Sequence, residues 1–145
     1  MTQPYEGGCE CGAIRYRITG EPMVVYACHC TICQAQSGSA FGMGFRITED
    51  QFELTKGTLK SFQRVATSGQ VFTNSFCPDC GTRIYHLAER SVGMVSLKPG
   101  TLDDTSWLVA SHQIFTGSAQ PWVVMPEGSK VFETVPQDPK WLRGK

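Results

Sequence analysis

The chain has 145 residues, of which 41% are hydrophobic and 18% charged, a length and composition typical of one globular domain with its own core. Thirteen basic and thirteen acidic residues cancel to a formal net charge of zero, which argues against nucleic acid as a partner. No apolar run approaches the roughly 20 residues that span a bilayer, and the polar start lacks the pattern of an export signal. We therefore expect a single domain over residues 1–145, located in the cytoplasm and without membrane contact.

Alternation of apolar and polar side chains with a period of two is the dominant pattern and predicts short strands. In chain order, the strands expected are 14–18, 41–47, 71–77, 83–87, 94–97, 110–115, 122–125 and 130–133. Helical signals are few: a short helix is expected over Thr31–Ser37, ending at Gly38, and a single turn over 102–108. The sequence predicts a mainly β fold of antiparallel sheets with few short helices.

Seven cysteines are present, an odd number, and no export signal accompanies them. In a reducing compartment clustered thiols serve as metal ligands or catalytic groups more often than as disulfides. They fall into three groups along the chain: Cys9-Glu10-Cys11, Cys28-His29-Cys30-Thr31-Ile32-Cys33, and Cys77-Pro78-Asp79-Cys80. This pattern favours zinc over a disulfide framework.

Cys77 and Cys80 form the most specific of these motifs. Pro78 and Gly81 favour a tight turn that brings two thiolates to one Zn²⁺. A redox dithiol would require a helix that begins at the motif, whereas the segment that follows, 83–85, has the pattern of a strand. We therefore favour a metal knuckle.

Cys9 and Cys11 are the natural second pair, because a structural zinc takes four ligands. In a regular strand their Cα atoms would stand about 6.5 Å apart, which is wide for one tetrahedral ion. We expect the glycines on either side, Gly7-Gly8 and Gly12, to bend this segment. A closed structural zinc site would then join the start of the chain to its middle, and metal binding would stabilise the folded state directly.

The three cysteines that remain, Cys28, Cys30 and Cys33, provide a second site. Three protein ligands and an open coordination position are the arrangement of a catalytic zinc, and the open position can take a water or a substrate thiol. His29 lies between two ligands, and its side chain is expected to point away from them. The alternative is that a distant histidine, His86 or His112, closes the site.

The order of these motifs resembles the glutathione-dependent formaldehyde-activating enzyme family, which includes centromere protein V-like proteins. The matching segments are 8–12, 28–33, 37–38, 75–82, 99–103 and 112–115, followed by Trp122, so the resemblance covers about residues 7–135. It implies a β-tent fold of antiparallel sheets and two zinc ions. By the same resemblance, the structural zinc is bound by the thiolates of Cys9, Cys11, Cys77 and Cys80. The catalytic zinc is bound by those of Cys28, Cys30 and Cys33.

The activity that the resemblance implies is the joining of glutathione, as cosubstrate, to formaldehyde, which is classed as a carbon–sulfur lyase reaction in the reverse direction. We therefore expect a zinc-dependent carbon–sulfur lyase-type enzyme that acts on glutathione or a similar small thiol and a small aldehyde. The second zinc is expected to be lost more readily than the first and to be only partly occupied under some conditions.

Two other functions stay open: a non-catalytic binding module that uses zinc for structure, and redox sensing through the three clustered thiols. A homodimer formed by sheet-edge pairing also stays open. The sequence does not assign the residues that contact glutathione. Candidates, each with surface charge or ordinary packing as the default, are Arg46, Lys60, Arg64, Arg83, Phe115 and Trp122.

Overall fold

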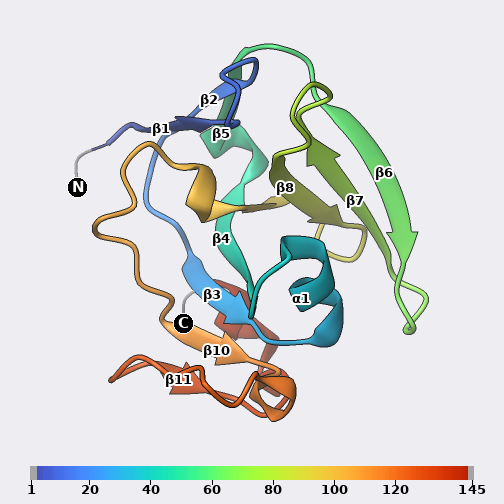
Figure 1. Ribbon diagram of the computed structural model, residues 1–145, viewed down its shortest axis with the longest axis vertical. Coiled ribbons are helices and arrows are strands. Elements are labelled where there is room, and N and C mark those ends of the chain that lie inside the picture. Colours follow the sequence, from blue (N-terminus) through green and yellow to red (C-terminus); the bar gives the residue numbers. More distant parts are fainter. Residues whose placement is uncertain (1–2, 144–145) are drawn as a thin grey trace. The chain divides into compact units, whose positions relative to one another are not determined.

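A computed structural model describes residues 3–143 and shows a mainly β fold, as expected (Figure 1). The strands, in chain order, are β1 (Tyr5–Gly8), β2 (Arg15–Ile18), β3 (Val24–Cys28), β4 (Gly42–Thr48), β5 (Phe52–Lys56), β6 (Lys60–Val65), β7 (Val71–Phe76), β8 (Arg83–Ala88), β9 (Met94–Leu97), β10 (His112–Ile114) and β11 (Lys130–Val131). One α-helix, α1 (Thr31–Ser37), and brief 3₁₀ turns complete the described part of the chain. No helix within it is long and apolar enough to cross a bilayer.

The chain divides into two compact units, each assembled from two stretches of sequence. The first unit contains the stretch that ends at Glu21 together with Ile47–Trp107, and the second contains Pro22–Arg46 together with the stretch that begins at Leu108. Each group of thiols therefore belongs to one unit, the four-cysteine group to the first and the three-cysteine group to the second.

The first unit holds two antiparallel sheets. Strands β1, β2 and β5 form one of them in that order, and β9, β8, β7 and β6 lie side by side in the other (Figure 1). The alternation read from the sequence is confirmed in β2, where Tyr16 and Ile18 are buried in the core and Arg17 is exposed. Ile84 of β8 and Leu97 of β9 are also fully buried.

The second unit holds a mixed sheet in the order β11, β10, β3 and β4. Strand β3 is buried along its whole length and pairs antiparallel with β4. On its other side β10 runs parallel to β3, with Ile114 opposite Cys28, and β11 runs parallel to β10. The two parallel pairs differ from the expected antiparallel arrangement, because alternation reveals the faces of a strand but not the direction of its partner.

The expected helix over Thr31–Ser37 is confirmed, with both of its ends as the sequence indicates. Its N-cap is Cys30, and Gly38 ends it in the left-handed conformation with φ of 63°, donating its backbone N–H to the carbonyl of Gln34. The strand expected at 122–125 and the turn expected at 102–108 are not regular elements, whereas β1, β3, β5 and β6 are strands that the alternation did not single out.

Candidate metal centres

The first candidate centre brings together the four cysteines predicted for the closed site. The sulfur atoms of Cys9, Cys11, Cys77 and Cys80 all lie within 4.8 Å of one another. The Cys9 and Cys11 sulfurs are 3.6 Å apart, and the Cys11 and Cys77 sulfurs 3.8 Å. Cys77 is fully buried and Cys9 nearly so, whereas Cys11 is exposed.

Two tight turns, rather than strands, present these sulfurs. The backbone N–H of Gly12 donates to the carbonyl of Cys9 at 3.2 Å, and Gly12 has φ of 82°, a conformation that a residue with a Cβ seldom adopts. The turn at Cys77 is built in the same way, since Gly81 donates to its carbonyl at 2.9 Å with φ of 78°. The expected bend at Gly12 is therefore confirmed, whereas Gly7-Gly8 remain paired in β1.

Hydrogen bonds to sulfur favour the thiolate form of two cysteines at this centre, Cys9 and Cys80. The backbone N–H of Ile14 donates to the Cys9 sulfur at 3.1 Å. The Thr82 hydroxyl lies 3.1 Å from the Cys80 sulfur, and this hydrogen bond is the main cause that lowers the pKa of Cys80 to about 6. The same hydroxyl oxygen accepts from the backbone N–H of Glu10 at 3.3 Å, so Thr82 connects the two turns.

The donor set fits Zn²⁺. Tetrahedral coordination at a Zn–S distance of about 2.3 Å places ligand sulfurs about 3.8 Å apart, close to the two separations observed here. Four soft sulfur donors on two rigid turns are also the usual composition of a structural zinc site. The four-cysteine group could therefore hold a metal ion as the sequence predicts.

The second candidate centre contains the three cysteines Cys28, Cys30 and Cys33, whose sulfur atoms also lie within 4.8 Å of one another. Cys28 is buried at the end of β3, while Cys30 and Cys33 are partly exposed. The backbone N–H of Cys33 donates to the Cys30 sulfur at 3.3 Å as part of the helix cap. A hydrogen bond with Cys33, together with burial, raises the pKa of the Cys28 thiol well above its usual range. Three converging sulfurs fit a thiophilic metal ion, which would displace the thiol protons.

His29 lies between two of these cysteines in the sequence, but its side chain forms a hydrogen bond with a residue outside the three-cysteine group. The ring is fully buried, and its Nε2–H donates to Oε1 of Gln113 at 2.8 Å. The side-chain nitrogen of Gln113 in turn donates to the carbonyl of Ala110. The side-chain oxygen of Gln113 is therefore the atom that accepts from His29. The ring of Phe41 packs beside the imidazole with centroids 5.2 Å apart. His29 is therefore part of the packing that supports the segment.

The two distant histidines considered as a further ligand have other partners. Nδ1 of His112 lies 2.9 Å from the Ser111 hydroxyl, and its ring packs on Phe132 and Trp141. Burial lowers the pKa of His112. His86 belongs to the first unit, where its Nδ1 accepts from the Lys98 ammonium group at 2.8 Å. Both are hydrogen-bonded, His112 in a buried and His86 in a partly buried position, which is the ordinary role of this residue.

Several residues that support the candidate centres could not be found from the sequence. Thr82 lies 72 residues from Glu10, and Gln113 lies 84 residues from His29. The carbonyl of His29 accepts two further hydrogen bonds, from Gln34 Nε2 at 2.8 Å and from the Ser118 hydroxyl at 3.0 Å. No motif marks polar residues of this kind, because their role depends on a pairing that only the fold creates.

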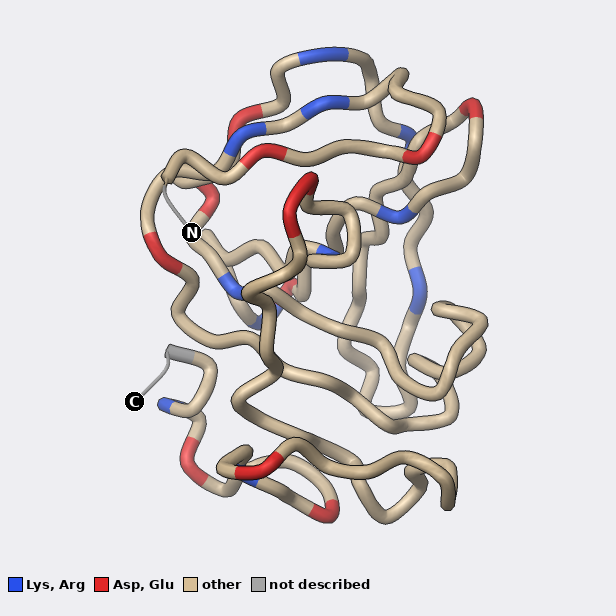
Figure 2. Tube along the Cα trace, turned by 60° about the vertical axis from the view of Figure 1, so that its left-hand side comes forward, with Lys and Arg blue, Asp and Glu red and all other residues tan. Residues whose placement is uncertain are grey.

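The basic residues considered as partners for a substrate carboxylate have varied environments. Arg46 is 5% exposed on β4, so the surface position expected for it is wrong. The guanidinium of Arg64 lies over the ring of Phe72 at 4.8 Å, and Arg83 donates to the Asn74 side chain. Acidic and basic residues are mixed along the trace and form no long stretch of a single sign (Figure 2).

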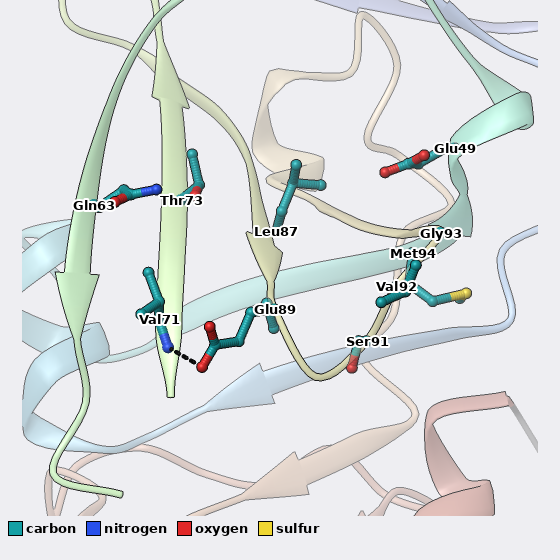
Figure 3. A pocket seen from close by; sticks show the side chains of 11 residues that line it. Glu49, Gln63, Val71, Thr73, Leu87, Glu89, Ser91, Val92, Gly93 and Met94 are labelled. Carbon is teal, nitrogen blue, oxygen red and sulfur yellow. Dashed lines mark hydrogen bonds between the residues drawn. The ribbon is translucent and has the colours of Figure 1, made fainter. Parts of the chain in front are cut away.

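A pocket of about 280 Å³ lies in the first unit and contains neither group of thiols. Strands β6, β7 and β8 and the turn after β8 line it (Figure 3). In it the carboxylate of Glu89 accepts from the backbone N–H of Val71 at 3.0 Å. No cysteine lines this pocket, so the candidate centres are defined by the thiols and not by this hollow.

A family model and a solved structure are similar to this chain. The model of the family described as "Glutathione-dependent formaldehyde-activating enzyme" matches residues 4–118. A crystal structure of a Rhodobacter sphaeroides protein superposes with a TM-score of 0.54 at 18% sequence identity, covering 68% of this chain and 87% of the other. At that identity the likeness concerns the fold alone.

Proposed function

Because the chain belongs to the glutathione-dependent formaldehyde-activating enzyme family, we propose that it is a zinc-dependent enzyme of the carbon–sulfur lyase type. Its substrates are a small thiol, glutathione in the first instance, and a small aldehyde such as formaldehyde. The four-cysteine group is the structural zinc site and the three-cysteine group is the catalytic one. A cytoplasmic location, where glutathione is abundant and thiols stay reduced, agrees with this chemistry.

The observation that carries the proposal is the convergence of Cys28, Cys30 and Cys33 as a group of three thiols separate from the group of four. Four thiolates complete the coordination shell of a tetrahedral ion, whereas three leave one position for a substrate. The partial exposure of Cys30 and Cys33 supports access from solvent. The nearly complete burial of Cys9 and Cys77 agrees with a structural role for the other group.

The reaction needs little beyond a thiolate and a polarised aldehyde. The sulfur of the substrate adds to the carbonyl carbon, the π electrons of the C=O bond move to oxygen, and the proton lost by the thiol ends on that oxygen. A bound zinc ion supplies a lower pKa for a substrate thiol and Lewis acidity toward an aldehyde oxygen. Atoms and charges balance without a further reactant, and the reverse sequence releases the aldehyde.

The contribution of the protein is to hold three thiols in place before substrate arrives. Cys28 is fixed by strand pairing on both sides, with Gly42 and with Ile114. His29 is held through its backbone N–H, its carbonyl and its ring, each of which has a hydrogen-bond partner in the same unit. Cys33 is carried by helix α1. This support would keep the three thiols in place, so that a metal ion bound to them retains a free position for substrate.

Metal content and cobalt spectroscopy test the proposal. We expect two zinc ions per chain in the wild-type protein and one in a folded Cys33→Ser variant. After exchange of the second zinc for Co²⁺, reduced glutathione should change the visible absorption in a saturable manner, because a thiolate enters the coordination shell. The Cys33→Ser variant should show no such change.

A contrary result would favour the alternative function. If the wild-type protein holds two metal ions but the cobalt spectrum does not respond to glutathione or to other small thiols, the second centre is closed. The chain would then be a non-catalytic module stabilised by zinc.

A further inference from the structure

Phe115 has a strained backbone directly beside the three-cysteine group. Its φ is 55°, and it is the one residue other than glycine with a positive φ in the part of the chain that the structure describes. A bulky aromatic residue seldom adopts this conformation, and residues held in this way cluster at functional sites. Phe115 follows Ile114, the residue paired with Cys28, and packs against the same buried cluster as Cys30 and Cys33. The strain redirects the chain as it leaves β10.

The segment that follows carries an indole that is exposed yet held in place. The side chain of Trp122 is 71% exposed. Its Nε1–H nevertheless donates to Oε1 of Gln120 at 2.7 Å, so the ring has a defined position. An exposed aromatic ring held in this way presents a rigid contact surface at a low cost in conformational entropy.

The hydrogen-bond chain that holds Trp122 continues to the three-cysteine group. Gln120 donates through Nε2 to Oε1 of Gln34 at 3.3 Å. Gln34, the residue after Cys33, donates through Nε2 to the carbonyl of His29 at 2.8 Å and to that of Ser118 at 2.9 Å. The amide of Gln34 thereby uses both of its donors and its acceptor. The exposed indole is thus connected by two glutamine side chains to the backbone between Cys28 and Cys30.

We propose that Trp122 binds the carrier portion of the thiol substrate, and that Gln120 and Gln34 are positioning residues that hold the indole beside the three-cysteine group. This inference rests on the proposed function. Formaldehyde is too small to need an aromatic surface, whereas a peptide-like thiol has amide planes and methylene groups that pack on an indole. Recognition of the carrier by Trp122 would select among thiols, while the sulfur goes to the metal centre.

Fluorescence and calorimetry of the zinc-loaded protein with reduced glutathione test the inference. Glutathione should change the tryptophan emission of the wild-type protein in a saturable manner. Trp122→Phe should abolish the change, whereas Trp107→Phe should preserve it, since Trp107 belongs to the first unit and its indole donates to the carbonyl of Asp104. Calorimetry of Trp122→Ala should show an affinity for glutathione about five- to tenfold lower than that of the wild type, the usual effect of an aromatic contact.

The positioning role has a separate readout. Gln120→Leu should weaken glutathione binding less than Trp122→Ala does and should shift the tryptophan emission even without glutathione, because the indole loses its hydrogen-bond acceptor. Gln120→Glu, which keeps an acceptor for the indole, should restore the wild-type emission.

The possible outcomes separate the inference from the function on which it rests. If the wild-type protein binds glutathione and Trp122→Ala binds it equally well, the inference is overturned and the proposed function stands. If the wild-type protein binds neither glutathione nor another small thiol, the proposed function fails and the inference fails with it. Circular dichroism checks that each variant keeps its fold, which the exposure of Trp122 leads us to expect.

Discussion

Gly42 lies directly against Cys33. A Cβ atom added at Gly42 would stand 3.2 Å from the Cβ of Cys33, closer than side chains usually pack, and 3.6 Å from its sulfur. Gly42→Ala should therefore displace Cys33 from the other two thiols. Overpacking of this kind costs about 1–3 kcal/mol, so we expect affinity for the second metal ion to fall by about tenfold or more. Competition with a chromophoric chelator measures this affinity.

Gly100→Ala is the matched control for that variant. A Cβ atom at Gly100 meets nothing within 4 Å, and the residue lies in the first unit. Both metal affinities should therefore stay at their wild-type values. A Gly42→Ala variant that retains the second metal as tightly as this control would show that Cys33 is not held where the structure has it.

Gln113→Leu tests the support given to His29. The substitution removes the acceptor for the Nε2–H of a fully buried imidazole. A buried donor left without a partner costs about 1–3 kcal/mol, so the free energy of unfolding in urea should decrease by that amount. Gln137→Leu, at an exposed position of the same unit, should leave it nearly unchanged. Equal stability of the two variants would contradict the importance of this hydrogen bond.

Thr82→Val tests the connection between the two turns of the four-cysteine group. Its hydroxyl is the main cause that lowers the pKa of Cys80 to about 6, so the thiolate, and with it the proposed structural zinc, should persist to lower pH. Removing the hydroxyl raises this pKa, and zinc release during acid titration should therefore occur at higher pH than in the wild type. Thr55→Val, at an exposed position on β5, should release zinc at the wild-type pH. Identical release curves for both variants would mean that Thr82 does not stabilise the thiolate.

Cys77→Ser and Cys33→Ser should differ in their effect on folding. Cys77 is fully buried in the four-cysteine group, where the proposed structural zinc would contribute directly to folding. Its loss should therefore cost about 3 kcal/mol or more, or roughly 10 °C in Tm for a chain of this length. Cys33 is partly exposed on a short helix, and its replacement should lower Tm by only a few degrees. Melting followed by circular dichroism distinguishes the two. Equal losses of Tm would remove the distinction between a structural and a catalytic centre.

The sequence predicts local features of this protein well. Gly38 as the end of helix α1 follows from the freedom of glycine to adopt positive φ, and the turns at Gly12 and Gly81 follow from the same property. The two sets of cysteines that converge are the sets that ligand counting and family resemblance indicate. Motifs of this kind are visible because the residues that act together are close in sequence or chemically rare.

Features that depend on distant pairing could not be predicted in the same way. Strand β3 is buried on both faces and has no alternation, and the parallel partner β10 follows it after a long connection. The support of His29 by Gln113 arises only when that pairing forms. The strain at Phe115 likewise has no local signature, since a phenylalanine ordinarily adopts negative φ. These features decide how the three-cysteine group is held, and only the structure reveals them.

The rate of exchange between free glutathione and its hydroxymethyl adduct shows directly whether the three-cysteine group is catalytic. Two-dimensional exchange NMR measures this rate in an equilibrium mixture of glutathione and formaldehyde. Zinc-loaded wild-type protein should accelerate the exchange above the rate in buffer, and folded Cys33→Ser protein with an intact four-cysteine site should not. Exchange at the buffer rate with the wild-type protein, or equal acceleration by both proteins, would contradict this catalytic role.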